Sequence, residues 1–314
     1  MDKRENLLSL VAGNRSPLFV PAAFFLHFPA QFHAGQAAVE KHLEYFRYTG
    51  MDFVKIQYEA NFPHLAQIQT PDDWARMPFY GLDFYDGQLK AVEGLVKAAQ
   101  QEAVIVQTLY SPFMCAGHTT SDETLTSHLD QQPDKVRKGL EVITDSLLQF
   151  VRACIRLGVD GFYTSTQGGE AGRFTNPGVF EQYVKPFDLT LMNEVNQTCH
   201  FNILHVCDYR RDYADFSPFL DYPGHVVNCP LKLGARQLSP TEAARMFARP
   251  YMGGMERLGV IATGTPEQVR QAAEAVLAAA PEKFILGADC TVPNDTPWDN
   301  LKAAIETAHA FQRH

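Results

Sequence analysis

The sequence predicts a single α/β domain of the (β/α)8 barrel class that spans residues 1–314. Eight short apolar runs recur along the chain, amphipathic helical stretches separate them, and no linker or low-complexity segment divides the sequence. Hydrophobic residues make up 46% and charged residues 20%, which is ordinary for a packed globular protein. An open doubly wound sheet is the alternative. The count of eight runs and a closing helix over 297–311 favour the barrel.

The eight runs have the composition of buried parallel strands. Most are rich in Val, Ile, Phe or Tyr, and each is five to eight residues long. The runs are 18–25, 52–58, 103–110, 159–165, 201–206, 225–229, 247–252 and 283–287. Pro250 makes the seventh run the least typical of a central strand, because proline cannot donate to a strand ladder.

Several helices between the runs carry clear start signals. A capping side chain stands directly before a proline, which has no N–H to leave unpaired at the first helical position. These capping residues are Asn176, Ser239, Thr265 and Thr296. Apolar residues at three- and four-residue spacing then make 265–279 the clearest helix. The gaps after the second and third runs are long, which predicts extra loops or helices over the carboxyl-terminal mouth of the barrel.

Charge and cysteine content limit the classes of binding partner and the cellular compartment that we expect. The chain has 27 basic and 36 acidic residues, a net charge of −9, so it lacks the basic face that binding to nucleic acid requires. The sequence contains no run of 18 apolar residues, so it predicts no membrane-spanning helix. Six cysteines are too few for a disulfide scaffold. We expect a cytoplasmic protein with reduced cysteines, and a homodimer is the assembly considered.

Two strand ends carry the residues of a candidate metal site. Chemistry in such a barrel lies at the carboxyl ends of the strands. His205 and Cys207, two residues apart at the fifth end, project from the same face, and Cys290 arrives at the same rim after the eighth run. One imidazole and two thiolates form a zinc ligand set with an open fourth position. The alternative is a core histidine beside buried cysteines, and Cys229 is a candidate substitute ligand.

Other polar residues follow the runs and are candidates for binding and catalysis. Gln167 and Tyr58 are expected at the mouth, where they would fix a substrate or cofactor, and Asp208 directly follows a predicted ligand. His27 is a candidate proton carrier. Glu170 is a candidate base or fourth metal ligand, although its Gly-Gly-Glu context is also typical of a plain turn.

These residues resemble a known family. The stretches GVDGFYTSTQG, NPGVFEQYVKPFDLTLMNEV and the segment from MGGMERLGV to the last helix are similar to the uroporphyrinogen decarboxylase superfamily. The resemblance covers most of the chain and implies a (β/α)8 barrel. In that superfamily the decarboxylases use no metal and bind tetrapyrrole carboxylates with an N-terminal arginine cluster. The cobalamin-dependent methyltransferases carry zinc on a His-x-Cys…Cys motif.

The chain resembles the methyltransferase branch more closely. It matches the zinc motif at His205, Cys207 and Cys290, whereas FVPAAFFLHFPAQFHAG near the N-terminus contains no arginine. It departs from the motif at Asp208, where glycine is usual. The resemblance implies a zinc-dependent methyltransferase that moves a methyl group between a corrinoid and a small thiol. The corrinoid would be free cobalamin or held by a corrinoid protein, because the sequence has no Asp-x-His-x-x-Gly stretch.

Two other functions stay open at this stage. A carboxy-lyase acting on a tetrapyrrole would need a basic cleft and no metal. A carrier or sensor that binds a corrinoid protein or a tetrapyrrole without turnover would share the fold, because fold alone does not determine function.

Overall fold

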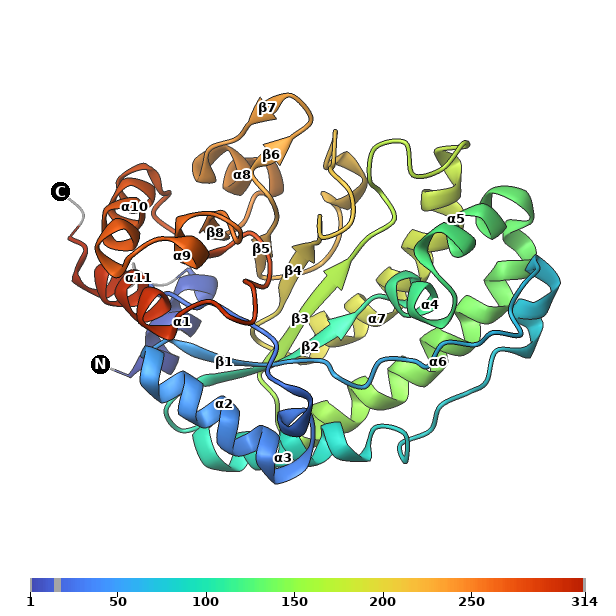
Figure 1. Ribbon diagram of the computed structural model, residues 1–314, viewed down its shortest axis with the longest axis horizontal. Helices are drawn as coiled ribbons and strands as arrows, with labels where there is room; N and C mark the ends of the chain where they lie inside the picture. Colours follow the sequence, from blue (N-terminus) through green and yellow to red (C-terminus); the bar gives the residue numbers. More distant parts are fainter. Residues whose placement is uncertain (1, 14–17, 313–314) are drawn as a thin grey trace.

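A seven-stranded parallel sheet forms the centre of the computed structural model, which describes residues 2–13 and 18–312. The strands are β1 (Phe53–Ile56), β2 (Val104–Tyr110), β3 (Gly161–Thr166), β4 (Ile203–Val206), β5 (Val226–Asn228), β8 (Tyr251–Met255) and β9 (Phe284–Ala288). They pair in that order, with Ser165 of β3 opposite His205 of β4. Nearly every strand residue is buried, as expected for parallel strands covered on both faces. The sheet is curled and has helices packed around it (Figure 1).

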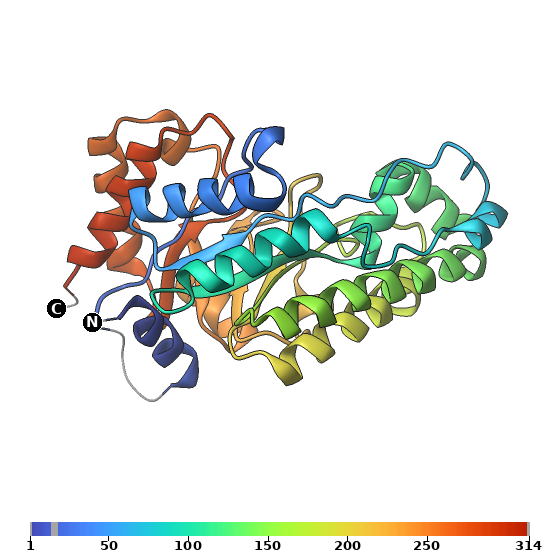
Figure 2. The same ribbon diagram turned by 90° about the horizontal axis from the view of Figure 1, so that it is seen from below.

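Helices cover the outside of the sheet before, between and after its strands. These are α2 (Gly35–Thr49), α3 (Asp86–Ala99), α6 (Pro133–Leu157), α7 (Lys185–Thr198), α8 (Pro240–Phe247), α10 (Pro266–Ala279) and α11 (Trp298–Ala310). Helix α1 (Lys3–Ala12) precedes them and a short α9 (Val260–Thr263) lies before α10. The view from below shows α2, α3, α6 and α7 side by side along the sheet (Figure 2). None of the helices in the described ranges is long and apolar enough to cross a membrane.

The predicted additions lie at the carboxyl ends of the strands. After β2 the chain forms α4 (Pro112–Thr119) and α5 (Asp122–Gln131), and the long connection after β1 contains the short helix η2 (Pro71–Arg76). A small hairpin of β6 (Lys232–Leu233) and β7 (Arg236–Gln237) follows β5. The smaller turns are η1 (Ala30–Phe32), η3 (Phe180–Val184) and η4 (Ser217–Phe219).

The first predicted strand, 18–25, does not form a ladder, so a closed eight-stranded barrel is not confirmed. The segment is extended but makes only an isolated parallel bridge, between Ala22 and Leu286. Ala23 N donates to Leu286 O at 3.0 Å, and Asp52 N donates to Ala22 O at 3.0 Å. Pro21 has no N–H, and the Ala22 N–H is taken by the Asp52 carboxylate at 2.7 Å. These two missing donors interrupt the ladder between β9 and β1.

The capping signals predicted some helix starts well and others less well. Ser239 and Thr265 each form a capping box, with Glu242 and with Gln268, so α8 and α10 begin as expected. Pro297 itself occupies the N-cap position of α11, one residue later than the sequence predicted. The predicted start of the seventh strand was wrong. Phe247 ends α8, and the strand begins at Tyr251, after Pro250.

Candidate metal centre and cavity

His205, Cys207 and Cys290 form one cluster at the carboxyl end of the sheet. Their ligand atoms all lie within 4.8 Å of one another. His205 lies on β4 and Cys207 directly after it, while Cys290 follows β9, and all three side chains are buried. The two-residue spacing therefore does project the imidazole and the first thiol to the same side of the sheet.

The donor set fits a zinc ion. His205 Nδ1 is buried and has no hydrogen-bond partner among the described residues, which leaves a ring nitrogen available as a ligand. A hydrogen bond from the Cys290 thiol and the nearby His205 ring lower the pKa of Cys207, although burial opposes this. The same bond and burial raise the pKa of Cys290. One nitrogen and two sulfurs match three of the four ligands of a tetrahedral zinc site.

A cavity of about 690 Å³ opens beside the cluster. This is the size of a pocket for a small molecule. Phe113, Met114 and His118 of α4 line one side, and the three cluster residues line another. The predicted extra helices thus contribute directly to the wall of the site.

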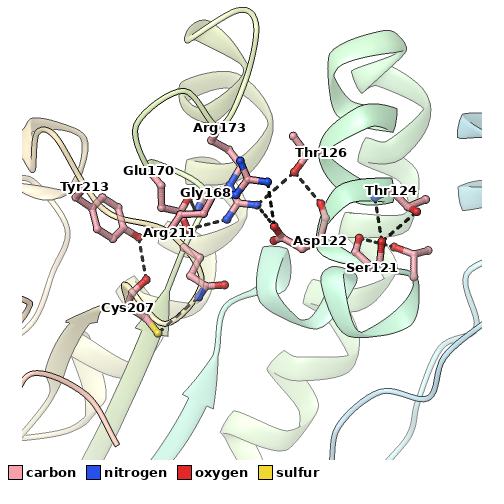
Figure 3. Close-up of polar contacts among 12 residues, drawn as sticks. Ser121, Asp122, Thr124, Thr126, Gly168, Glu170, Arg173, Cys207, Arg211 and Tyr213 are labelled. Carbon is pink, nitrogen blue, oxygen red and sulfur yellow. Dashed lines mark hydrogen bonds and ion pairs between the residues drawn. The ribbon is translucent and has the colours of Figure 1, made fainter. Parts of the chain in front are cut away.

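Three neighbouring side chains contact the cluster. Gln167 follows β3, lines the cavity, and donates from Nε2 to Cys207 Sγ at 3.6 Å. Tyr213 Oη donates to the backbone oxygen of Cys207 at 3.2 Å (Figure 3). The Tyr163 ring lies 5.0 Å from the His205 ring, centre to centre. Such partners fix the direction in which a metal ligand points.

Glu170 lies in a buried ion-pair cluster and does not line the cavity. Its two carboxylate oxygens accept from Arg173 at 2.8 and 2.9 Å, and one also accepts from Gly168 N at 2.8 Å. Arg173 also pairs with Asp122 at the start of α5, and the Arg173 and Glu170 side chains are 1% and 0% exposed. In Figure 3, Glu170 faces Arg173 rather than Cys207. Neither oxygen is directed at the metal cluster, so the structure does not favour Glu170 as base or ligand.

Tyr58 does not line the cavity. The sequence alone did not indicate which face of β1 points toward the cavity. Lys55, Gln57 and Glu59 line the cavity, so the alternate residues face the outer helices. Tyr58 is fully buried against Tyr110 and a ring of α6. Burial raises its pKa. Tyr58 is therefore a packing residue in this arrangement.

His27 lines the cavity, as expected, and is held by Glu59. His27 Nδ1 lies 2.8 Å from Glu59 Oε1, and His33 Nδ1 lies 3.5 Å from Glu59 Oε2. Both rings are about one-third exposed, at 32% and 34%. Glu59 is therefore the residue that holds both histidines.

Asp208 directly follows Cys207 and is not among the residues that line the cavity. Burial and the nearby Asp289 raise the pKa of Asp208 to about 6. Its Oδ1 has no hydrogen-bond partner among the described residues. Asp289 accepts from Arg257 N at 2.8 Å and Cys290 N at 3.0 Å, which fixes the turn that carries the third ligand.

The sequence did not predict several residues of the cavity, and it did not decide whether Cys229 is a ligand. Lys55, His33, His118, Arg210 and Arg257 line the cavity. A lysine in the middle of the apolar run 52–58 was the available signal for the first of them. Cys229 is fully buried and lies outside the three-residue cluster.

Comparison with known proteins identifies the family. The sequence profile of the uroporphyrinogen decarboxylase (URO-D) family matches residues 45–311. The chain belongs to the uroporphyrinogen decarboxylase family. The resemblance found in the sequence is thereby confirmed, and the family's barrel-like fold agrees with the curled parallel sheet.

Similar proteins within this family are methyltransferases. The chain is 24% identical over 253 residues to the methylcobamide:CoM methyltransferase MtbA of Methanosarcina mazei, covering 78% of this chain and 70% of that protein. It is 23% identical to the methylated-thiol–coenzyme M methyltransferase of the same organism, covering 69% of this chain and 56% of that protein. A solved methyltransferase from Methanosarcina mazei superposes with a TM-score of 0.79 at 15% identity, covering 98% of both chains.

Proposed function

We propose that this protein is a zinc-dependent methyltransferase that moves a methyl group between a corrinoid and a small thiol. The observation that carries the proposal is the buried cluster of His205, Cys207 and Cys290 on the wall of a cavity. The relatives support an enzyme that transfers methyl groups: one is a methylcobamide:CoM methyltransferase, and the other a methylated-thiol–coenzyme M methyltransferase. Because one of these relatives is matched over only 56% of its length, the acceptor is proposed on chemical grounds.

The donor set determines what the site would do. When bound, zinc would supply an open position that lowers the pKa of a thiol and keeps it as a thiolate. His205, Cys207 and Cys290 would hold the ion, and Gln167 would orient Cys207 through its 3.6 Å contact. A methylated corrinoid would supply an electrophilic methyl group: the thiol sulfur would bond to the methyl carbon, the carbon–cobalt bond would break, and its electron pair would stay with cobalt. The reverse transfer uses the same groups.

The other predicted residues receive distinct roles. His27 would accept the thiol proton and pass it to solvent, since its ring is 32% exposed and Glu59 fixes its Nδ1. Glu170 would act as a positioning residue for the loop that carries Gln167. The corrinoid, free or on a partner protein, would approach the cavity mouth.

Metal content and methyl transfer test the proposal together. We expect about one zinc per chain in untagged protein, measured by plasma mass spectrometry, and loss of zinc in Cys290→Ala. Cys229→Ser is the matched control, because this buried cysteine lies outside the cluster and should keep the metal. Demethylation of methylcobalamin by a thiol, followed by absorbance, should be lost with the zinc.

Other outcomes would assign the protein differently. Full methyl transfer in His205→Ala, Cys207→Ala and Cys290→Ala would contradict the zinc mechanism. Zinc binding without turnover of any corrinoid would favour a carrier or sensor. The absence of arginine from residues 19–35 counts against the tetrapyrrole carboxy-lyase.

A further inference from the structure

Lys55 is an unusual buried cation. Two cationic side chains in the described ranges belong to the buried class, Arg173 and Lys55. Arg173 has two carboxylates within ion-pair distance. Lys55 is 5% exposed, and within the described residues no carboxylate lies within ion-pair distance of it. A buried charge without a counter-charge is costly unless a ligand supplies one.

The surroundings hold the Lys55 ammonium in one place. Its Nζ donates to Gln57 Oε1 at 2.7 Å and lies 4.7 Å from the centre of the Phe25 ring and 4.8 Å from that of Tyr163. The Gln57 amide cannot turn over, because its Nε2 donates to Leu26 O at 2.6 Å. Gln57 therefore fills one donor of the ammonium, and the two rings stabilise its charge.

The remaining Lys55 donors face the cavity. Lys55 lines that cavity, and one hydrogen bond is the whole of its described polar contact, although an ammonium has three donors. The two carboxylates on the same cavity are already paired: Glu59 with His27 and His33, and Asp122 with Arg173. Lys55 therefore offers unused hydrogen-bond donors, held in a fixed position, to whatever occupies the cavity.

The ammonium and the metal cluster share a neighbour. The Tyr163 ring lies 4.8 Å from Lys55 Nζ and its centre is 5.0 Å from that of the His205 ring. Burial lowers the pKa of Lys55 to about 7, while the charges of Cys290, Glu59 and Cys207 oppose that shift. In a zinc-loaded site the metal would take up the two thiolate charges. The pKa of Lys55 would then fall further, and an anion bound in the cavity would be what keeps the side chain protonated.

We propose that Lys55 is a specificity-determining residue that binds the anionic end of the thiol substrate while the sulfur lies at the metal cluster. This deepens the proposed function and rests on it. The substrate class is a short thiol acid with a carboxylate or similar oxyanion at the far end. Charge-assisted hydrogen bonds to such a group are among the strongest polar contacts in proteins.

The test compares two thiols that differ in one end. Titration calorimetry on the zinc-loaded protein measures the Kd of 3-mercaptopropionate and of 3-mercapto-1-propanol. We expect the acid to bind the wild type about tenfold tighter or more, and Lys55→Met to reduce that preference to about twofold. Lys302→Met is the matched control, because it removes the same charge from a side chain that is 44% exposed. It should keep the wild-type preference.

A second variant keeps Lys55 itself in place. Gln57→Glu would put a carboxylate on the ammonium at the position of the 2.7 Å contact. We expect it to lose the preference for the acid while it keeps zinc and the affinity for the alcohol. This variant also covers the case in which Lys55→Met does not fold.

The outcomes separate this inference from the proposed function. A wild type without preference, or a Lys55→Met variant that keeps it, overturns the role of Lys55. Loss of zinc from Lys55→Met, with the acid preference unchanged in zinc-restored protein, would mean that Lys55 only balances the cysteine thiolates. Binding of the acid through Lys55 in a protein that moves no methyl group would refute the proposed function alone.

Discussion

The buried ion pair between Arg173 and Glu170 makes a strong prediction for Arg173→Met. The substitution removes two contacts to Glu170, at 2.8 and 2.9 Å, and the pair to Asp122. Asp122 keeps Arg211 at 3.6 Å, but Glu170 keeps only the Gly168 N–H. Removing one partner of a buried pair costs about 3–5 kcal/mol. The paired side chains are 1% and 0% exposed, so solvent screening does not reduce this figure.

Thermal unfolding at pH 7.5, followed by circular dichroism, measures the effect. At about 2 °C per kcal/mol for a chain of this size, we expect the Tm of Arg173→Met to fall by about 6–10 °C. Arg152→Met is the matched control, since Arg152 makes the same two-point contact with Glu194, at 2.6 and 2.8 Å, on the surface. An exposed pair of this kind contributes less than about 1 kcal/mol.

A second substitution identifies the uncompensated charge as the cause. Glu170→Gln in the Arg173→Met background removes the orphaned carboxylate, so about half of the lost stability should return. A Tm for Arg173→Met within about 2 °C of that of Arg152→Met would refute the reasoning. So would a double variant that is no more stable than Arg173→Met alone.

Two further predictions concern stability. Burial lowers the pKa of His42 to about 4 from 6.5, so its neutral form stabilises the fold fully above pH 6.5 and this contribution is lost as pH falls toward 4. Urea unfolding should show about 2 kcal/mol of this loss between pH 7.5 and 5, and His42→Gln should flatten the slope; an unchanged slope would contradict it. Gly161→Ala would put a methyl group 1.7 Å from Phe201 O, so we expect about 3 kcal/mol of destabilisation or more, and a wild-type Tm would count against the close strand packing.

The cluster of His205, Cys207 and Cys290 was predictable because strand geometry is local. The alternation of side chains along a strand puts residues two apart on one face, so His205 and Cys207 had to project together wherever β4 ended. Cys290 followed from the rule that parallel strands in a barrel end at one rim. The order of the strands likewise followed from the sequence of apolar runs, because consecutive βα units lie side by side.

The direction of β1 was not predictable by the same reasoning. A strand covered on both faces has no clean alternation of polar and apolar residues, so the sequence does not say which face points inward. Tyr58 was therefore assigned to the mouth, whereas Lys55 and Glu59 are the residues that reach the cavity. The ion pair of Glu170 with Arg173 could not be predicted from the sequence either. Arg173, its partner three residues on, also contacts Asp122, 51 positions away, and only the folded chain reveals that contact.

The failed strand prediction has a physical cause that is visible only in the fold. Pro21 in run 18–25 is a local signal against a regular strand, because proline has no N–H to donate. The loss of the Ala22 donor, however, depends on the side chain of Asp52. Asp52 in turn lies 2.8 Å from His309 Nε2, near the other end of the chain. No local pattern contains that arrangement.

The bridge between Ala22 and Leu286 also has a consequence for biosynthesis. The segment around Ala22 emerges from the ribosome before any strand of the sheet, whereas β9, its bonding partner, emerges after all the others. The edge of the sheet at β9 and the segment around Ala22 can therefore pair only after nearly the whole chain has been synthesised. Pairings between segments so distant in sequence form slowly. A nascent chain or a truncated product that ends before β9 carries an exposed apolar segment with unsatisfied backbone groups. Such chains are the ones that aggregate or need a chaperone.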